Sequence, residues 1–185
     1  MKKLIFSIFT IFILCDVVSA GPWKSYSEFQ KYLSLKNAAK QAEAEGDTFN
    51  AVSNYLKAAE VASKSADANV QAWQLNNAAY SLISRFKKLT DYDQKLKKLT
   101  GMQPSKEKIA YQKEFAEMLN LQFPLLQEAQ DILEKTKNMG EELEAKEKIT
   151  SNLDFIAWVK DFITTNLNGD DENKQVKEES TTKSK

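Results

Sequence analysis

Residues that could carry out chemistry are sparse in this chain and occur as simple neighbours. Serine and lysine are adjacent in Ser63-Lys64-Ser65 and in Ser105-Lys106, and such a pair can supply a nucleophile and its base. Paired carboxylates, which acid–base catalysis can use, occur at Glu141-Glu142 and at Asp91 with Asp93. All of these residues lie at expected turns or helix ends, where acids complement the helix dipole and lysines are solvated. We therefore interpret them as parts of helix ends, not as catalytic residues.

The residues that most often complete an active site are missing. The chain has no histidine, and its one cysteine is Cys15. Without histidine, the commonest general base, the usual catalytic triads and the commonest transition-metal ligand are absent. Neither a phosphate-binding glycine loop nor a calcium-loop signature occurs. We therefore expect no enzymatic activity, no catalytic, cofactor-binding or metal-binding residues, and no cofactor.

The first twenty residues have the three parts of a secretory signal peptide. Lys2 and Lys3 give a positive start, an apolar run extends from Leu4 to Leu14, and Val18-Ser19-Ala20 places compact residues before a cleavage point. We therefore predict a signal peptide over residues 1–20, cleaved after Ala20, and an exported protein that is periplasmic or extracellular. Because Cys15 lies inside this segment, the processed chain would carry no thiol and no disulfide.

Two alternatives would keep the chain at a membrane. A retained anchor would need about 20 apolar residues, and Asp16 interrupts this run. Lipid attachment at Cys15 would need small residues just before the cysteine, where Leu14 is bulky. We expect the protein to be membrane-associated only if the signal is retained or Cys15 is lipidated.

The rest of the chain has the composition of a helical domain. Glycine and proline are rare, with five and three copies, and strong helix formers dominate. We predict one all-α domain over residues 21–167. Breaks at Gly46-Asp47, Gly101 to Pro104 and Gly140 separate its helices, and Pro124 either kinks a helix or divides it in two. The expected helices are 25–45, 48–63, one beginning at Asp67, 91–99, 105–123, 125–139 and 141–167.

The last residues have a different composition from the domain. Residues 168–185 are rich in lysine, glutamate and serine and contain one apolar residue, Val176. Such a segment cannot bury enough apolar surface to offset the entropy lost on ordering. We predict that it is a disordered polar tail.

Apolar spacing indicates which side chains of the helices enter the core. In the second helix, either Phe49 or Val52 is expected to be buried. Trp73 and Tyr80 lie seven residues apart in the third helix, which places them on one face, and we expect both in the core. Asn76 and Asn77, like Lys36 and Lys40 of the first helix, are expected at the surface.

The first two helices resemble a tetratricopeptide repeat, mainly over residues 32–64. The spacing of bulky, small and turn residues carries this resemblance: Leu35, Ala38, Ala39, Ala42, Gly46, Asp47, Ala51, Tyr55 and Ala58. Ala42 replaces a usual tyrosine, Ala38 a usual leucine, and Ser63 a usual proline. The resemblance implies a repeat-like hairpin over residues 25–64, stacked with further helices over residues 67–167 in a short array. A plain antiparallel helical bundle with an alanine-rich hairpin is the alternative.

The distribution of charge offers a second clue. The formal net charge of the chain is zero, which gives no overall attraction to nucleic acid. Between residues 85 and 113, however, nine basic residues accompany three acidic ones. This stretch could bind an anionic lipid or glycan, or it could be a solvated face balanced by the acidic stretch from Glu128 to Glu147.

Together these features predict an exported, non-catalytic helical module that binds a protein or peptide partner. In the repeat family, grooves between inner helices hold peptides, and their lysines and asparagines can clamp a carboxylate. The register of Lys36, Lys40, Asn76 and Asn77 does not match that clamp fully. The alternative is an envelope-surface binder of anionic lipid or glycan, acting through the basic helices around residues 85–113.

Overall fold

A computed structural model of the chain describes residues 23–140 and 142–182; for Ser65 and residues 168–182 only the backbone is considered. Over these residues the chain forms six helices and no strand, which confirms the all-α prediction. The helices are α1 Tyr26–Glu45, α2 Thr48–Ser65, α3 Ala68–Leu89, α4 Tyr92–Gly101, α5 Lys106–Lys137 and α6 Lys146–Thr182. The predicted signal peptide, with Cys15 and Ala20, lies outside the described residues and stays a prediction.

Side-chain caps fix where the helices begin. Asp47 accepts a hydrogen bond from the backbone N–H of Asn50 at 3.1 Å, and Asp67 accepts one from Val70 at 3.0 Å. Both aspartates are therefore the N-caps of the helices that follow them. Gly46 ends α1 with a φ of 78°, a left-handed conformation that glycine adopts without steric cost. The turn between α1 and α2 is thus encoded by two adjacent residues.

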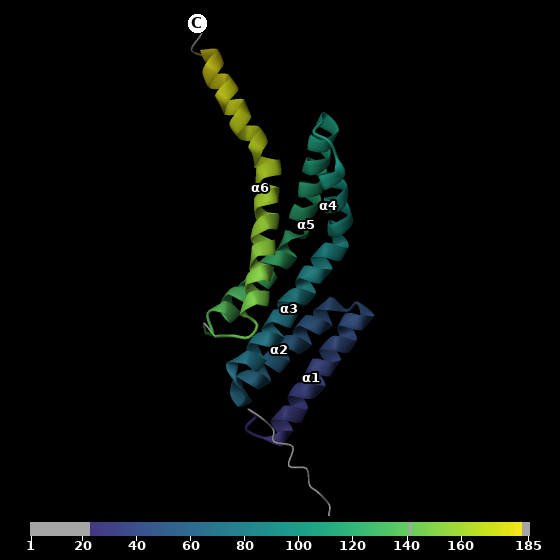
Figure 1. The fold of residues 1–185 in the computed structure, drawn as a ribbon, viewed down its shortest axis with the longest axis vertical. Coiled ribbons are helices and arrows are strands. Elements are labelled where there is room, and N and C mark those ends of the chain that lie inside the picture. The colour runs from purple at the N-terminus through teal and green to yellow at the C-terminus, as the bar shows by residue number, and fades with distance from the viewer. Residues whose placement is uncertain (1–22, 141, 183–185) are drawn as a thin grey trace, which may run out of the picture.

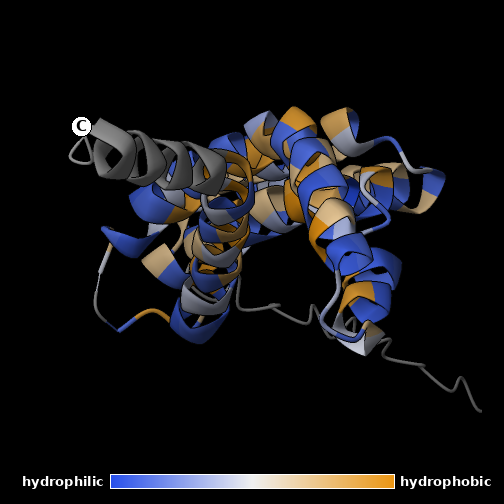
Figure 2. Ribbon diagram, turned by 90° about the horizontal axis from the view of Figure 1, so that it is seen from above, coloured by the Kyte–Doolittle hydropathy of each residue, from blue (hydrophilic) through white to orange (hydrophobic). Residues whose placement is uncertain are grey.

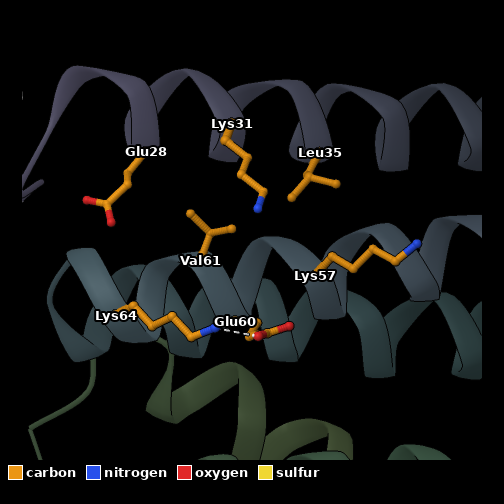
Figure 3. A pocket seen from close by; sticks show the side chains of 7 residues that line it. All are labelled: Glu28, Lys31, Leu35, Lys57, Glu60, Val61 and Lys64. Atoms are coloured by element: carbon orange, nitrogen blue, oxygen red, sulfur yellow. Dashed lines mark hydrogen bonds and ion pairs between the residues drawn. The ribbon is translucent and has the colours of Figure 1, made fainter.

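Small residues let α1 and α2 pack closely as a hairpin. Ala39, Ala51 and Ala58 are fully buried, and the Tyr55 ring is buried beside them. These are residues that carry the tetratricopeptide resemblance, although an alanine-rich hairpin in a plain bundle would bury them as well. A hollow lies between the two helices, where Lys31 points from α1 toward α2 and Lys64 pairs with Glu60 (Figure 3).

Helix α3 is the centre of the arrangement. It packs against α2 on one side and against α5 on another, and it also touches α4 and α6. Helix α5 turns back along α3, and α6 runs along α5 (Figure 1). Beyond the α1–α2 hairpin, α4 and the beginning of α5 continue beside α6, and the turn that connects α4 to α5 lies remote from the start of α1 (Figure 1).

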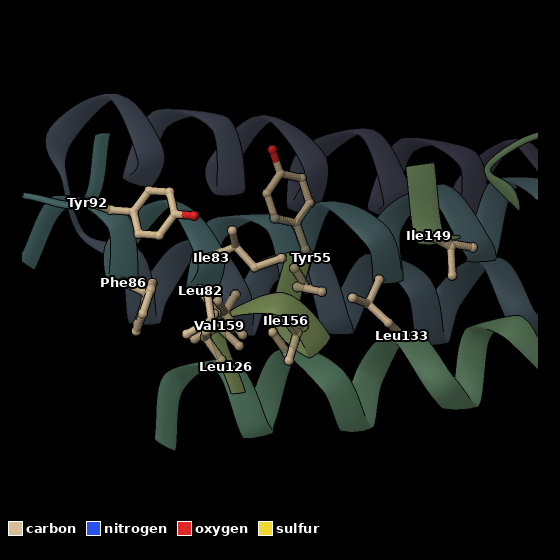
Figure 4. Close-up of a cluster of buried hydrophobic side chains, with 14 of the residues drawn as sticks. Tyr55, Leu82, Ile83, Phe86, Tyr92, Leu126, Leu133, Ile149, Ile156 and Val159 are labelled. Atoms are coloured by element: carbon tan, nitrogen blue, oxygen red, sulfur yellow. The ribbon is translucent and has the colours of Figure 1, made fainter. Parts of the chain in front are cut away.

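The hydrophobic core follows α3 and its neighbours. Apolar residues lie mainly where helices face one another, and hydrophilic residues lie mainly on the outer sides (Figure 2). Leu82 and Phe86 of α3 meet Leu126 of α5 and Ile156 of α6 in the cluster shown in Figure 4. Full burial of such side chains contributes roughly 1.5–3 kcal/mol each, so the α3–α5–α6 contacts are a main source of stability.

The structure corrects two predicted helix boundaries in the second half of the domain. Pro124 lies inside α5, so of the two alternatives at this residue the division into helices 105–123 and 125–139 is wrong, and a single helix spans both ranges. Helix α6 begins at Lys146 instead of residue 141. The segment before it folds against the core instead, with Leu143 and Ala145 buried and the N–H of Glu144 donating to Asn69 Oδ1 at 3.0 Å.

The C-terminal end of α6 also differs from the sequence prediction. The helix was expected to end at Leu167, whereas the structure continues it to Thr182. Six of the fifteen added residues are lysine, glutamate or glutamine, which are good helix formers, and no proline follows Gly169 to stop the helix.

Candidate functional site

The serine–lysine neighbours that could carry out chemistry make local contacts within their helices. Ser63 donates its hydroxyl to the carbonyl of Glu60 at 2.8 Å, while Lys64 pairs with the carboxylate of the same glutamate. Ser105 is the N-cap of α5 and accepts from the N–H of Lys108 at 3.2 Å. Each side chain therefore stabilises a helix end or a helix turn, as the sequence suggests.

The acidic pairs lie apart from any cluster of ligands. Asp91 and Asp93 are exposed at the start of α4, and Glu142 is exposed beside Glu141, which lies outside the described residues. In the part of the chain that the structure describes, no three histidine, cysteine, aspartate or glutamate side chains come close enough to hold a metal ion. No helix in the same part is long and apolar enough to cross a membrane.

The groups whose pKa is shifted owe the shift to packing or to helix contacts. Burial raises the pKa of Tyr32, and burial raises that of Tyr92 to about 12, with the negative charge of Asp93 adding to the effect. For Tyr55 the pKa is raised by burial and by its bond to the Glu43 carboxylate. The hydrogen bond from Lys64 lowers the pKa of Glu60.

One face of α3 remains open along most of the helix. The residues that share it follow one another at steps of three or four, which places them on a single side. We call this set the α3 stripe: Trp73, Asn77, Tyr80, Ser84 and Lys88. Trp73 and Asn77 are half-buried, whereas the Tyr80 side chain is 55 % exposed and Ser84 and Lys88 are exposed.

Contacts to α1 define one edge of the α3 stripe. Gln74 Nε2 donates to the Tyr32 hydroxyl at 3.0 Å, and Ser81 donates its hydroxyl to the Glu43 carboxylate. At about 100° per residue, both α3 residues lie on the same side of Tyr80. The first helix therefore runs beside the stripe on this side.

Contacts to α6 define the opposite edge. Asn152 Nδ2 donates to Asn76 Oδ1 at 3.1 Å, and Lys87 Nζ lies 4.6 Å from the centroid of the Phe155 ring. Asn76 and Lys87 lie on the other side of Tyr80 by the same helical geometry. The α3 stripe is therefore the floor between α1 and α6.

Two adjoining hollows open along the C-terminal half of the α3 stripe. One, of about 320 Å³, is lined by α3 residues together with Glu43, Gly46 and Thr48 of the hairpin. The other, of about 460 Å³, reaches the start of α4 at Asp91 and Tyr92. Tyr80, Ser84 and Lys88 line both. Hollows of several hundred cubic ångströms suit a few side chains of a partner.

Two cations, Arg85 and Lys88, lie with the Tyr80 ring around the same hollow and could bind an anionic group there. Arg85 and Lys88, one turn apart, have no acidic partner within the described residues. The nearby Glu43 carboxylate is already engaged, since Tyr55 donates to it at 2.8 Å as well as Ser81. A ring that exposes its face and two available cations can hold an apolar group next to a carboxylate.

The structure corrects the predicted positions of several side chains around the stripe. Tyr80 was expected in the core with Trp73 but is the most exposed aromatic residue of α3, while Trp73 is half-buried against the core. Asn76 was expected at the surface but is buried against α6. Sequence spacing placed Trp73 and Tyr80 on one face correctly, but it did not show which neighbours cover each end of that face.

The other residues predicted at the surface, Lys36 and Lys40 of α1, lie outside the α3 stripe. Lys40 is exposed, and Lys36 is half-buried with its amine 5.7 Å from the centroid of the Tyr32 ring. The hollow on the α1–α2 hairpin, lined by Lys31, Lys57 and Glu60 among others, has acids and bases side by side (Figure 3). It lacks an exposed aromatic side chain, so the α3 stripe is the better candidate.

Comparison with known proteins supplies no further assignment: no protein-family model, no curated protein and no solved structure matches the chain.

Proposed function

We propose that this protein is an exported, non-catalytic helical module that binds a peptide segment of a partner protein along the α3 stripe. One observation carries the proposal. Tyr80 exposes 55 % of its side chain on the floor between α1 and α6, with hollows on either side of it. Tyrosine is enriched in protein interfaces because it offers a large rigid ring and a polar tip.

The geometry of the floor suits an extended or helical peptide. Half-buried Trp73 and Asn77 lead into exposed Tyr80, so a partner segment would follow the axis of α3. Arg85 and Lys88 lie beyond Tyr80, where they favour a segment that carries an acidic side chain. Residues that tie the floor to its walls, such as Gln74 and Ser81, would hold the surface in shape before a partner binds.

A displayed library of random peptides, selected on the purified protein, tests this proposal without knowledge of the partner. We expect enriched sequences that contain aspartate or glutamate, with binding measured by fluorescence anisotropy. Tyr80→Ala and Lys88→Glu should each weaken binding about tenfold or more, since the few central residues that carry most of an interface's binding energy each cost more than about 1 kcal/mol when they are removed.

Matched variants on α2 control for general effects of exposure and charge. Phe49 is 66 % exposed and Lys57 is exposed, and neither lines the two hollows beside Tyr80. Phe49→Ala and Lys57→Glu should leave the affinity unchanged. Equal losses in the two pairs, or no loss in Tyr80→Ala and Lys88→Glu, would rule out the α3 stripe as the binding surface.

A further inference from the structure

A second surface, separate from the α3 stripe, lies where α4 meets α5. This turn lies at one end of the α4–α5 pair, remote from the start of α1 (Figure 1). We call it the basic tip and define it as Lys97, Lys98, Lys106, Lys108 and Ile109. Between Lys97 and Lys108 the chain holds four lysines and a single acidic residue, Glu107.

The lysines of the basic tip form no ion pair with a described acidic residue. Lys97 and Lys106 are exposed and have no acidic partner in the region that the structure describes. Lys108 donates to the backbone carbonyl of Met102 at 2.9 Å, and Lys98 lies 4.6 Å from the centroid of the Tyr111 ring. These contacts leave all four positive charges unneutralised at the turn.

An apolar side chain accompanies these charges. Ile109, one turn into α5, is 66 % exposed, and Met102 of the connecting turn is half-buried. Burying an exposed isoleucine in hydrocarbon gains free energy, whereas lysines beside it can keep their ammonium groups at the level of the headgroups.

We propose that the basic tip docks the protein onto an anionic lipid bilayer. Each lysine near a negatively charged membrane surface adds to the attraction, and an apolar side chain that enters the interface adds a contribution that does not depend on charge. A polysaccharide would satisfy the lysines but would leave Ile109 in water.

Co-sedimentation with vesicles tests the proposal. The probes are vesicles of phosphatidylcholine alone and of phosphatidylcholine mixed with phosphatidylglycerol. We expect binding to the mixed vesicles only, weakened by added salt because screening shortens the range of the attraction to about 10 Å at 0.1 M. Replacing Lys97, Lys98, Lys106 and Lys108 together by glutamine should lower the partition coefficient more than about tenfold.

Two matched controls separate the basic tip from general charge and from residues 1–22, which every variant shares. A variant with Lys31, Lys40, Lys57 and Lys64 changed to glutamine loses the same charge on the hairpin and should still bind. Ile109→Ser should weaken binding, whereas Leu121→Ser, at a position 74 % exposed on the same helix, should not.

Three outcomes would overturn the proposal. They are equal losses in the two lysine variants, equal binding to both kinds of vesicle, and retention on an anionic polysaccharide without vesicle binding. Binding of acidic peptides at the α3 stripe should be unaffected by the tip variants, so the two proposals can fail separately.

Discussion

The hydroxyl of Tyr55 donates to Glu43 Oε2 at 2.8 Å, and Ser81 donates to the other oxygen of the same carboxylate. One side chain of α1 thus joins α2 to α3 beside Tyr80. These two hydrogen bonds hold the α1–α2 hairpin at one edge of the α3 stripe, close to the turn at Gly46.

Removing this carboxylate should destabilise the domain. Glu43→Ala leaves the Tyr55 hydroxyl without its acceptor and leaves the Ser81 hydroxyl only the backbone carbonyl of Asn77, which should lower the free energy of unfolding by about 1–3 kcal/mol. Glu45→Ala, two residues further along α1 and exposed, should change it by less than about 0.5 kcal/mol. Urea denaturation of both variants measures the difference; equal midpoints would show that the Glu43 contacts add nothing.

Gln74 offers a second test, because burying its polar side chain costs free energy unless its amide is hydrogen-bonded. Its side chain is 2 % exposed, its Nε2 binds Tyr32, and its Oε1 has no hydrogen-bond partner among the described residues. Tyr32→Phe alone would leave the amide wholly unsatisfied and should cost about 1–3 kcal/mol, whereas Tyr32→Phe with Gln74→Leu should be close to neutral. Additive losses in this double-mutant cycle would contradict a direct bond between the two side chains.

Stability should fall at alkaline pH. Burial raises the pKa of Tyr92 from 10.0 to about 12, so the fold favours its neutral form. The contribution of this residue is complete below pH 10 and is lost as the pH rises through about 12. Tyr92→Phe, followed by circular dichroism between pH 9 and about 12, should unfold less steeply with pH than the parent chain. Identical profiles would show that Tyr92 ionises as freely in the fold as outside it.

Pro124 should be a local weakness of α5. Its ring removes the N–H that would bond to the carbonyl of Asn120, and it is exposed, so no packing depends on it. Pro124→Ala should therefore raise the free energy of unfolding by about 1–3 kcal/mol. A lower stability would mean that α5 needs the proline to follow the surface of α3. Gln127→Ala, at an exposed position of the same helix, serves as the control.

The sequence predicts much of this fold because its local signals are strong. The turn and the helix starts depend on single residues: Gly46 ends α1, and Asp47 and Asp67 begin α2 and α3. The alanines at 39, 51 and 58 indicate a closely packed helix pair. The choice between Phe49 and Val52 needed the structure: Val52 is buried, and Phe49 is 66 % exposed. Helix α2 turns its alanines toward α1 and α3, and Val52 belongs to that side.

The candidate site was harder to predict because it depends on neighbours distant in sequence. Tyr80 and Trp73 share a face, but only Trp73 is covered, by the segment that contains Glu144; the Nε1 of Trp73 lies 3.5 Å from its carboxylate. Asn76 is buried because α6 supplies Asn152. Neither partner can be inferred from spacing within α3. Leu82, Ile83 and Phe86 already fill the opposite faces, which leaves Tyr80 open.

The different positions of these two aromatic residues should separate stability from binding. Trp73→Ala should cost about 3 kcal/mol, near the lower end for large core residues, because its ring packs against the core. Tyr80→Ala should change the free energy of unfolding by less than about 0.5 kcal/mol. Thermal melting would contradict this assignment if Tyr80→Ala lowered Tm as much as Trp73→Ala.

The most direct test of the proposed partner-binding surface is site-specific photocrosslinking in the cells that make the protein. A photoreactive phenylalanine derivative replaces Tyr80 in one variant and Phe49, which is more exposed, in another. Binding along the α3 stripe predicts a discrete adduct with one partner protein from position 80 and none from position 49. No adduct from position 80, or the same adducts from both positions, would contradict the proposal.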